Sequence, residues 1–354
     1  MDDLTSPAAE TDDGLGHRYI VIGAGAVGGT IGGRLAQAGR DVVLVARGEH
    51  LEHLAARGLH LRLPDGGLTY HLPAVPGPAP LGELTARDVL LLTVKVQDTE
   101  AALADWSAAP VAGGGTAAER LPLVCLQNGV ESPRLAMRRF RHVYAACVWL
   151  PSTFVEPGVI SAYGAPCSGV LHLGRYPHGV DDVVRGIARD LRASRFDVPV
   201  VPDVARWRYA KLLSNLNNAV EAVSGPVDSS ESRALCARLR AEGEAVLAAA
   251  GIAYTSPEEE QEARDGKATL VPVDGVPRGG GSAWQSLARS TGSIEADHLN
   301  GEIALLGRLH NVPTPLNELL QRLANGCARE RLPAGATPVR TLVRMADTVA
   351  GTLM

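Results

Sequence analysis

The chain has 354 residues, of which 45% are hydrophobic and 21% are charged, and its formal net charge at pH 7 is −5. This length allows two domains with substantial cores, and the mildly acidic balance gives no general attraction to nucleic acid or to anionic membranes. The longest strongly apolar runs, such as residues 89–94, are far too short to span a bilayer, so we expect a soluble protein without a membrane partner.

The beginning of the chain predicts no ordered element. Residues 1–17 start with two aspartates after the first methionine and contain no apolar core, so we expect a disordered acidic tail and not a secretory signal. The five cysteines are widely separated and form no C-x-x-C pair, which is typical of reduced thiols in the cytoplasm. We therefore expect a cytoplasmic location.

Residues 19–29 read YIVIGAGAVGG, an apolar strand that runs into a Gly-x-Gly-x-x-Gly turn and then a helix. The first glycine allows the tight turn, the second lets a pyrophosphate approach the backbone, and the third lets the helix close onto the strand. Free N–H groups at the helix start attract phosphates. Glycines also cluster in ordinary turns, but this context predicts a dinucleotide site made by Gly23, Gly25, Ala26, Val27 and Gly28.

The predicted second strand, residues 41–45, indicates which dinucleotide binds. NAD sites usually carry an acidic residue after this strand for the ribose 2′-hydroxyl, whereas this chain has Ala46-Arg47-Gly48. An arginine fork matches the geometry and charge of a 2′-phosphate, and the missing carboxylate removes a repulsion. We predict NADP(H) as the cofactor, with a solvated surface Arg47 as the alternative.

The helix predicted after this strand carries His50 and His53, three residues apart. Nothing nearby in the sequence completes a metal shell, so we interpret both as solvated surface histidines and expect no metal.

Short apolar strands alternate with helical stretches as far as residue 202, which is the signature of a parallel α/β sheet. The predicted strands are 18–23, 41–45, 89–94, 121–126, 143–149 and 198–201, with weaker candidates at 59–63, 158–162 and 170–174. The Pro-rich stretch 73–80 and the Gly/Ala-rich stretch 107–120 are expected to be loops.

After Pro202 the pattern changes to long amphipathic helices, predicted at 203–224, 230–251, 294–310 and 315–330. Residues 255–283 are rich in Pro, Gly and charge and are expected to be a long, partly mobile loop. We therefore predict a Rossmann-type α/β domain over 18–202 and an all-helical domain over 203–354, with the cleft between them at the carboxyl ends of the strands.

Polar residues collect at places that face this cleft. Lys95 and Asn128 follow two predicted strands, although Lys95 could be a surface cation and Asn128 part of a turn. On the helix 203–224, at about 100° per residue, Asn215 lies about 40° from Lys211, and Asn218 lies about 20° to its other side. This face suits a small polar ligand, or else it is a solvated face.

Glu295 and Ser282 are not informative by themselves. Glu295 lies near the start of a predicted helix and could simply be an acid favoured in a first turn, and Ser282 could be loop.

Taken together, these residues resemble the ketopantoate reductase (2-dehydropantoate 2-reductase) family over about residues 18–330. The matching pieces are GAGAVG, Arg47-Gly48, Lys95, Gln127-Asn128-Gly129, Arg206-Trp207 with Lys211-Leu212 and Asn215, Ser282 with Gln285, and Glu295 with Leu299-Asn300-Gly301. The resemblance implies a Rossmann-type domain followed by an all-α domain of the 6-phosphogluconate-dehydrogenase-like C-terminal type. It also implies hydride transfer from NADPH to the C2 carbonyl of a branched 2-oxo acid, by default 2-dehydropantoate to pantoate in pantothenate biosynthesis.

The same resemblance implies roles for single residues. Lys211 looks like the general acid at the carbonyl oxygen, and Glu295 like a substrate-orienting residue. Asn215 and Ser282 would hold the substrate's carboxylate and hydroxyl, while Lys95 and Asn128 would contact the nicotinamide ribose. An ammonium suits this reaction because it stabilises the developing negative charge and supplies the proton.

The chain also departs from the family pattern. Members commonly carry a second asparagine eight residues after the lysine, where this chain has Ala219. Asn218, one residue earlier, is the candidate substitute, and its direction differs by about 100° from the usual one. The segment between Gln285 and Glu295 is one residue longer than in the family pattern, and the inserts at 107–120 and 255–281 are longer than a compact member needs.

These departures leave three hypotheses open: a 2-dehydropantoate reductase, a related reductase for another branched or bulkier 2-oxo acid, and a non-catalytic NADP(H)-binding sensor. Retention of both Lys211 and Glu295 argues against the sensor. The amphipathic helices after residue 294 could form either an internal core or the seam of a homodimer.

Overall fold

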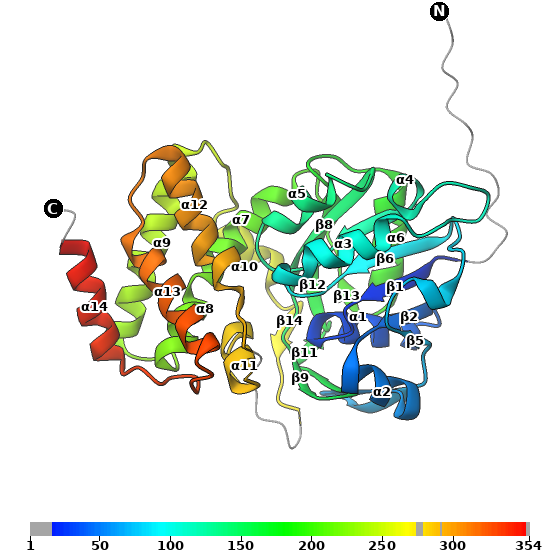
Figure 1. Ribbon diagram of the computed structural model, residues 1–354, viewed down its shortest axis with the longest axis horizontal. Helices are drawn as coiled ribbons and strands as arrows, with labels where there is room; N and C mark the ends of the chain where they lie inside the picture. The colour runs from blue at the N-terminus through cyan, green and yellow to red at the C-terminus, as the bar shows by residue number, and fades with distance from the viewer. Residues whose placement is uncertain (1–15, 274–278, 291, 352–354) are drawn as a thin grey trace, which may run out of the picture.

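The computed structural model describes residues 16–273, 279–290 and 292–351, so most of the predicted tail lies outside the described residues. An α/β part and a stack of helices lie side by side, and α10, α11 and β14 lie between them (Figure 1). This is the order of sheet and helices that the sequence predicts. The domain limits themselves stay a prediction.

The largest sheet has eight strands in the order β13-β12-β8-β7-β6-β1-β2-β5. Its strands are β1 (Arg18–Ile22), β2 (Asp41–Val45), β5 (Ala74–Val75), β6 (Asp88–Leu92), β7 (Pro122–Cys125), β8 (His142–Trp149), β12 (Gly169–Arg175) and β13 (Phe196–Asp197). The five strands from β8 to β2 run parallel, so their carboxyl ends meet at one edge. That edge is where a doubly wound sheet binds its ligands.

The sequence predicts a parallel sheet, but the observed sheet is mixed, because β12 runs antiparallel to β8. The chain returns from β8 through short strands, so no helical crossover forces a parallel return. The strand predicted at 198–201 is also wrong: β13 ends at Asp197, and only an isolated bridge from Leu173 to Val200 continues the pairing. Pro199 has no N–H to donate, which limits a ladder there.

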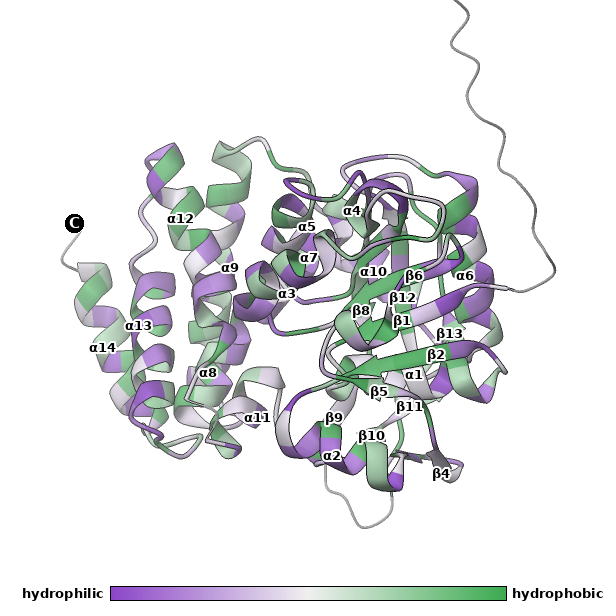
Figure 2. Ribbon diagram, turned by 45° about the vertical axis from the view of Figure 1, so that its right-hand side comes forward, coloured by the Kyte–Doolittle hydropathy of each residue, from purple (hydrophilic) through white to green (hydrophobic). Residues whose placement is uncertain are grey.

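Both faces of the central strands are buried. Ile20 and Leu90 pack into the core on one face, and Val21 and Leu91 into the core on the other. Figure 2 shows these strands as hydrophobic along their length. Such near-continuous apolar runs are expected of parallel strands covered by helices on both sides, and they explain why the sequence identified these strands.

A second sheet has four strands in the order β4-β3-β10-β9. Its strands are β3 (Leu59–Leu63), β4 (Gly66–Tyr70), β9 (Ser152–Glu156) and β10 (Val159–Ala162), and a two-stranded sheet joins β11 (Gly164–Pro166) to β14 (Ala268–Leu270). The weak candidate strands at 59–63, 158–162 and 170–174 are therefore real, although the first two belong to this separate sheet.

The helices of the α/β part are α1 (Ala26–Gln37), α2 (Gly48–Arg57), α3 (Thr99–Ser107), α4 (Ala117–Arg120), α5 (Glu131–Ala136) and α6 (Asp182–Ala193), with 3₁₀ turns η1 (Ala79–Leu81) and η2 (Val96–Asp98). The two stretches predicted as loops are partly ordered. Residues 73–80 contain β5 and most of η1, and residues 107–120 end in α4. A capping box between Thr116 and Glu119 starts α4, because each side chain bonds the other residue's backbone N–H.

The helical part contains α7 (Val204–Asn215), α8 (Asn217–Ser224), α9 (Ser230–Ala249), α10 (Pro257–Arg264), α11 (Ser282–Ala288), α12 (Asn300–His310), α13 (Pro315–Arg329) and α14 (Val339–Gly351), with η3 (Glu295–His298) before α12. The single helix predicted at 203–224 is divided into α7 and α8 at Leu216, and the one predicted at 294–310 starts with a 3₁₀ turn. Residues 255–283 are not one long loop, since they hold α10, β14 and the start of α11.

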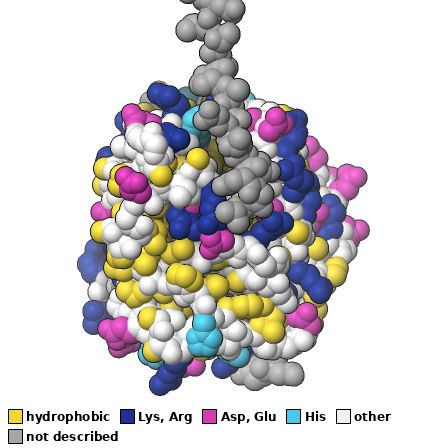
Figure 3. Space-filling view, turned by 90° about the vertical axis from the view of Figure 1, so that its right-hand side faces the viewer, with side chains coloured by type: hydrophobic (Ala, Val, Ile, Leu, Met, Phe, Trp, Pro, Cys, Tyr) yellow, Lys and Arg dark blue, Asp and Glu magenta, His cyan; other side chains and the backbone are white. Residues whose placement is uncertain are grey.

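Among the described residues, no helix combines the length and the hydrophobicity that a membrane span requires. Seen from the right-hand side of Figure 1, the surface carries both lysine and arginine and aspartate and glutamate, with hydrophobic side chains gathered between them (Figure 3). That face has no single sign of charge.

Candidate active site

The glycine turn between β1 and α1 has the geometry that its sequence predicts. Gly23 has a φ of +103°, and a Cβ there would lie 2.7 Å from the backbone N of Val94. A Cβ on Gly28 would overlap the carbonyl oxygen of Gly23 and the Thr93 hydroxyl oxygen. These two glycines are therefore required by the fold itself, the first for the turn and the second for the close approach of α1.

Gly25 is different, because an added Cβ would meet no atom within 4 Å and its φ of −75° suits any residue. Gly25 caps α1 without a side-chain hydrogen bond, so the N–H groups of Ala26 and Val27 start the helix without a partner from a capping side chain. All three residues line a cavity. Open space before unpaired helix N–H groups fits a bound pyrophosphate.

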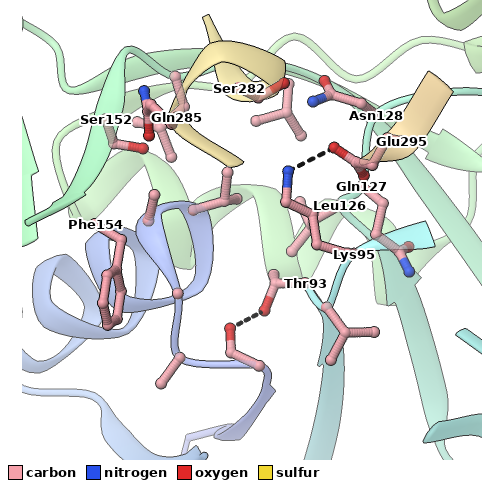
Figure 4. Close-up of a pocket in the computed structure, with 18 of the residues that line it drawn as sticks. Thr93, Lys95, Leu126, Gln127, Asn128, Ser152, Phe154, Ser282, Gln285 and Glu295 are labelled. Carbon is pink, nitrogen blue, oxygen red and sulfur yellow. Dashed lines mark hydrogen bonds and ion pairs between the residues drawn. The ribbon is translucent and has the colours of Figure 1, made fainter. Parts of the chain in front are cut away.

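This cavity has a volume of about 1050 Å³ and extends from the glycine turn to the helices beyond residue 202. Nearly all residues that the sequence singles out line it: Gly23, Gly25, Ala26, Val27, Arg47, Lys95, Asn128, Lys211, Asn215, Asn218, Ser282 and Glu295. Gly28 does not, which agrees with its packing role. In Figure 4, Ser282 on α11 and Asn128 after β7 lie near Lys95 and Glu295.

Arg47 caps the start of α2 and lies at the turn end of the cavity, where a 2′-phosphate would be expected. Its side chain is 69% exposed, and its Nη2 lies 3.5 Å from Oδ2 of Asp105 on α3. The residue is thus exposed at the surface, as the alternative interpretation has it, and also placed at the cavity. An exposed pair of this length contributes little free energy, so the arginine is available to an anion.

The interpretation of His50 as a solvated surface histidine is wrong, because both of its ring nitrogens bind the backbone. Its Nε2 lies 2.7 Å from the carbonyl oxygen of Ala24, and its Nδ1 accepts a hydrogen bond of 3.0 Å from the backbone N–H of Gly158. Accepting at Nδ1 places the proton on Nε2, and burial lowers the pKa of this histidine further. A neutral His50 therefore ties the glycine turn to the turn between β9 and β10. Among the described residues, no group of three His, Cys, Asp or Glu side chains is arranged to hold a metal.

Lys95 and Glu295 form an ion pair that joins the two parts of the chain. Lys95 Nζ lies 2.6 Å from Glu295 Oε2, and the Val96 backbone N–H donates to Glu295 Oε1 at 3.3 Å (Figure 4). The Glu295 side chain is buried, while Lys95 is about one-third exposed. The sequence predicts that both residues face the cleft, but nothing in it predicts that they bind each other.

Lys211 on α7 reaches across to the end of β8. Its Nζ donates to the carbonyl oxygen of Val148 and lies 4.5 Å from the centroid of the Trp149 ring. Burial is the largest of the causes that together lower the pKa of Lys211 to about 8; Cys147 opposes this shift, and the nearby charge of Arg208 contributes to it. A buried ammonium that titrates near neutral pH can act as a general acid.

The polar face predicted for one helix spans α7 and α8. Leu216, between them, keeps a helical φ of −57° and ψ of −29°, and its backbone N–H donates to the Leu212 carbonyl oxygen at 3.2 Å, so Asn218 on α8 follows Lys211 and Asn215 on α7 almost without interruption. All three side chains still line the cavity. Asn215 Nδ2 is buried and has no hydrogen-bond partner among the described residues, which suits a donor waiting for a ligand.

Sequence reasoning missed several residues of the cavity wall. Trp149 ends β8, Phe154 lies on β9, and Arg264 and Leu270 come from the stretch expected to be a loop. One signal was available for Arg264: Ser256-Pro257 followed by Glu259 is a helix start with a capping box, which predicts a helix over the next residues. Gln127 also lines the cavity, and its Nε2 donates to Thr99 Oγ1 at 2.9 Å.

Curated relatives match nearly the whole chain. A 2-dehydropantoate 2-reductase of Pyrococcus horikoshii is 26% identical over 332 residues, covering 90% of this chain and 99% of that protein. One of Mesorhizobium japonicum is 27% identical, covering 89% and 98%.

Solved structures show the same fold. The PanE/ApbA family ketopantoate reductase of Ralstonia eutropha JMP134 superposes with a TM-score of 0.73 at 27% identity, covering 89% of this chain and 99% of that one. A D-mandelate dehydrogenase, solved with NADH and anilino(oxo)acetate, has a TM-score of 0.74 at 21% identity over 89% of this chain and 99% of that one. At that identity the second likeness concerns the fold alone.

Two family models match this chain, ketopantoate reductase PanE/ApbA over residues 19–178 and ketopantoate reductase PanE/ApbA C terminal over residues 203–328. The resemblance drawn from single motifs is thereby confirmed, as are the fold class and the assignment to an oxidoreductase family. The chain belongs to the ketopantoate reductase PanE/ApbA family.

Proposed function

We propose that this protein reduces a branched 2-oxo acid to the 2-hydroxy acid with NADPH, and that Lys211 is the general acid. One observation carries the proposal: Lys211 and the glycine turn line the same cavity, although they are far apart in the sequence. A pure NADP(H) sensor would have no use for an ammonium there.

The choice of NADPH over NADH rests on Arg47. The family reduces its substrates with a nicotinamide dinucleotide, and the D-mandelate dehydrogenase of this fold was solved with NADH, so the fold is compatible with either form. In this chain the position after β2 carries an exposed arginine at the cavity and no acid. A guanidinium fork at that place favours a 2′-phosphate.

When bound, NADPH supplies a hydride to the C2 carbonyl carbon. Lys211 donates its proton to the carbonyl oxygen, so the products are the 2-hydroxy acid, NADP⁺ and a neutral lysine that recovers its proton from solvent. Asn215, Asn218 and Ser282 are proposed to hold the polar groups of the substrate. Glu295 acts by fixing Lys95 and the start of η2 beside the nicotinamide ribose, which its two hydrogen bonds support.

The default substrate is 2-dehydropantoate, as the names of the curated relatives suggest. A bulkier 2-oxo acid is the second candidate, and two observations favour it. Ala219 occupies the place of the family's second asparagine, and Leu270, which is 57% exposed, adds an apolar side chain to the cavity wall. Fewer polar contacts and more apolar surface suit a larger hydrocarbon group.

A panel of 2-oxo acids, followed by the loss of NADPH absorbance, tests the proposal. 2-Dehydropantoate should give the highest kcat/KM, and a higher value for an aryl or longer branched acid would select the second candidate. Purified protein that binds NADPH but consumes it with none of the acids would support the sensor and reject the enzyme. A homodimer stays a prediction, which the sedimentation of the purified protein tests.

A further inference from the structure

Residues 256–270 build one wall of the cavity from the stretch that the sequence suggests is loop. α10 starts at a capping box in which the Glu259 backbone N–H donates to Ser256 Oγ at 3.2 Å and the Ser256 backbone N–H donates to Glu259 Oε2 at 2.8 Å. β14 then pairs antiparallel with β11. Arg264, Ala268, Thr269 and Leu270 all line the cavity.

This wall is fastened to the rest of the molecule on both sides. Arg206 on α7 forms an ion pair of 3.3 Å with Glu259, and Lys267 forms one of 3.3 Å with Asp197 on β13. Beyond β14, the Val271 backbone N–H donates to the Tyr163 carbonyl oxygen at 2.8 Å. The pairing of β14 with β11 and the Val271 bond therefore hold the backbone of this wall, and the two exposed ion pairs add little.

Arg264, the last residue of α10, and Lys211 on α7 both contact the Trp149 ring. Its guanidinium carbon is 3.9 Å from the centroid of the Trp149 ring, and Lys211 Nζ is 4.5 Å from the same centroid. Arg264 Nε donates to the Glu260 carbonyl oxygen at 3.0 Å, which orients the guanidinium and leaves its two Nη atoms for another partner. Two cations from different elements thus share one aromatic ring at the substrate end of the cavity.

The charge of Arg264 is not neutralised within the described part of the chain. No carboxylate of those residues forms an ion pair with it, whereas Lys95 and Arg47 each have one. Glu260, on the same helix, is buried with one carboxyl oxygen unpartnered; burial raises its pKa above the usual value, and the charges of Arg264, Arg240 and Lys211 oppose that rise. Arg264 is therefore a cation without an ion-pair partner among the described residues, and it lines the cavity.

We propose that Arg264 is the residue that recognises the substrate's carboxylate, and that it determines the specificity for free 2-oxo acids. This inference rests on the proposed function and deepens it. In a 2-oxo acid the carboxylate is bonded directly to the carbonyl carbon, so Lys211 at the carbonyl oxygen needs a neighbouring group for the carboxylate. A guanidinium fork binds a carboxylate through two parallel hydrogen bonds. Asn215 and Ser282 are then left for the hydroxyl and the rest of the substrate.

The test compares a 2-oxo acid with its methyl ester, at saturating NADPH, in the wild type and in Arg264→Gln. The substitution should lower kcat/KM for the acid by roughly 100-fold, because a charged bidentate contact is lost, and change that for the ester by less than about threefold. Arg264→Lys keeps the charge without the fork, so its kcat/KM for the acid should lie between that of the wild type and that of Arg264→Gln. Arg206→Gln is the matched control, since it removes an anchor of α10 and leaves Arg264 in place, and it should not alter the ratio of acid to ester.

Equal losses for acid and ester in Arg264→Gln would overturn the proposal, since they would mean that the arginine only supports the wall. An unchanged rate for the acid would overturn it as well.

A second measurement distinguishes a failure of the proposed reductase function from a failure of the proposed carboxylate site. If the wild type reduces no 2-oxo acid, titration of the NADPH-loaded protein with oxamate, which cannot be reduced in this way, still decides whether Arg264 holds a carboxylate. Arg264→Gln should weaken oxamate by at least roughly tenfold, and equal affinity in both proteins would reject the site.

Discussion

Lys211 is the residue whose environment has the clearest chemical consequence. Burial lowers its pKa to about 8, whereas an exposed lysine titrates near 10.4. The lysine is thus still mostly an ammonium at neutral pH, yet it releases its proton readily. Both properties follow from removing the charge from water, since desolvation disfavours the charged form.

The direction of the reaction should therefore set the direction of the pH dependence. Reduction needs the ammonium, so its kcat/KM should be level at low pH and fall as the pH rises through about 8. Oxidation of the 2-hydroxy acid needs the neutral amine and should rise through the same pH. Measuring both profiles on one preparation checks this, and profiles that move in the same direction would contradict the role of Lys211.

Substitution gives a second test of the same residue. Lys211→Ala should lower kcat for reduction by roughly 10²–10⁴-fold, because proton donation and charge stabilisation are both lost. The affinity for NADPH, measured by fluorescence titration, should change little and serves as the control for folding. A loss of activity under about tenfold would exclude the general acid.

Substitutions of Arg47 and Asp105 should have opposite effects on the affinity for NADPH. Arg47→Ala should weaken NADPH much more than NADH, whereas Asp105→Asn should strengthen NADPH by a few-fold, since the acid 3.5 Å from the guanidinium competes with the phosphate. The second effect is small because both side chains are exposed. Dissociation constants of the two cofactors for the two variants provide the measurement. Equal weakening of NADPH and NADH by Arg47→Ala would show that the 2′-phosphate lies elsewhere.

At the scale of elements, the two glycines Gly25 and Gly28 in the turn from β1 to α1 have different roles: Gly28 is required for packing, and Gly25 is expected to serve cofactor binding. Gly28→Ala should destabilise the fold by about 1–3 kcal/mol, because the new Cβ overlaps the Gly23 carbonyl oxygen. Gly25→Ala meets no protein atom within 4 Å, so it should leave stability unchanged and weaken NADPH strongly. Denaturant unfolding without cofactor, together with NADPH titration, distinguishes the two. A stability loss in Gly25→Ala as large as in Gly28→Ala would contradict this division.

Elements whose patterns are local were predicted well. β1, β2 and β6 are continuous apolar runs with turn residues at both ends, and their positions follow from that pattern. α10 and α4 were missed inside supposed loops, because their surroundings are rich in Pro, Gly or Ala, although each begins with a capping box. The capping residues were the better signal there, since they report on the backbone directly.

At the scale of the molecule, one cavity uses both parts of the chain, so the bound cofactor should stabilise the whole. The Lys95–Glu295 pair and the wall formed by residues 256–270 both connect the α/β part to the helices. NADPH at one hundred times its dissociation constant should raise the free energy of unfolding by about 2.7 kcal/mol. Thermal unfolding with and without NADPH measures this, and Gly25→Ala should show a much smaller shift. An unchanged wild-type midpoint would mean that the cofactor does not bind the folded chain in this way.

The sequence by itself determined the glycine turn, the buried parallel strands and the family, and nearly all of the residues that it singled out for the site line the cavity. Each of these depends on neighbours a few positions away or on motifs read in order, and both are visible in one dimension. Only the tertiary structure decided that Lys95 binds Glu295, that His50 braces the turn, and that Arg264 shares the Trp149 ring with Lys211. These depend on how elements distant in the sequence pack together, because burial and facing charges are set by the packed neighbours and not by the local pattern.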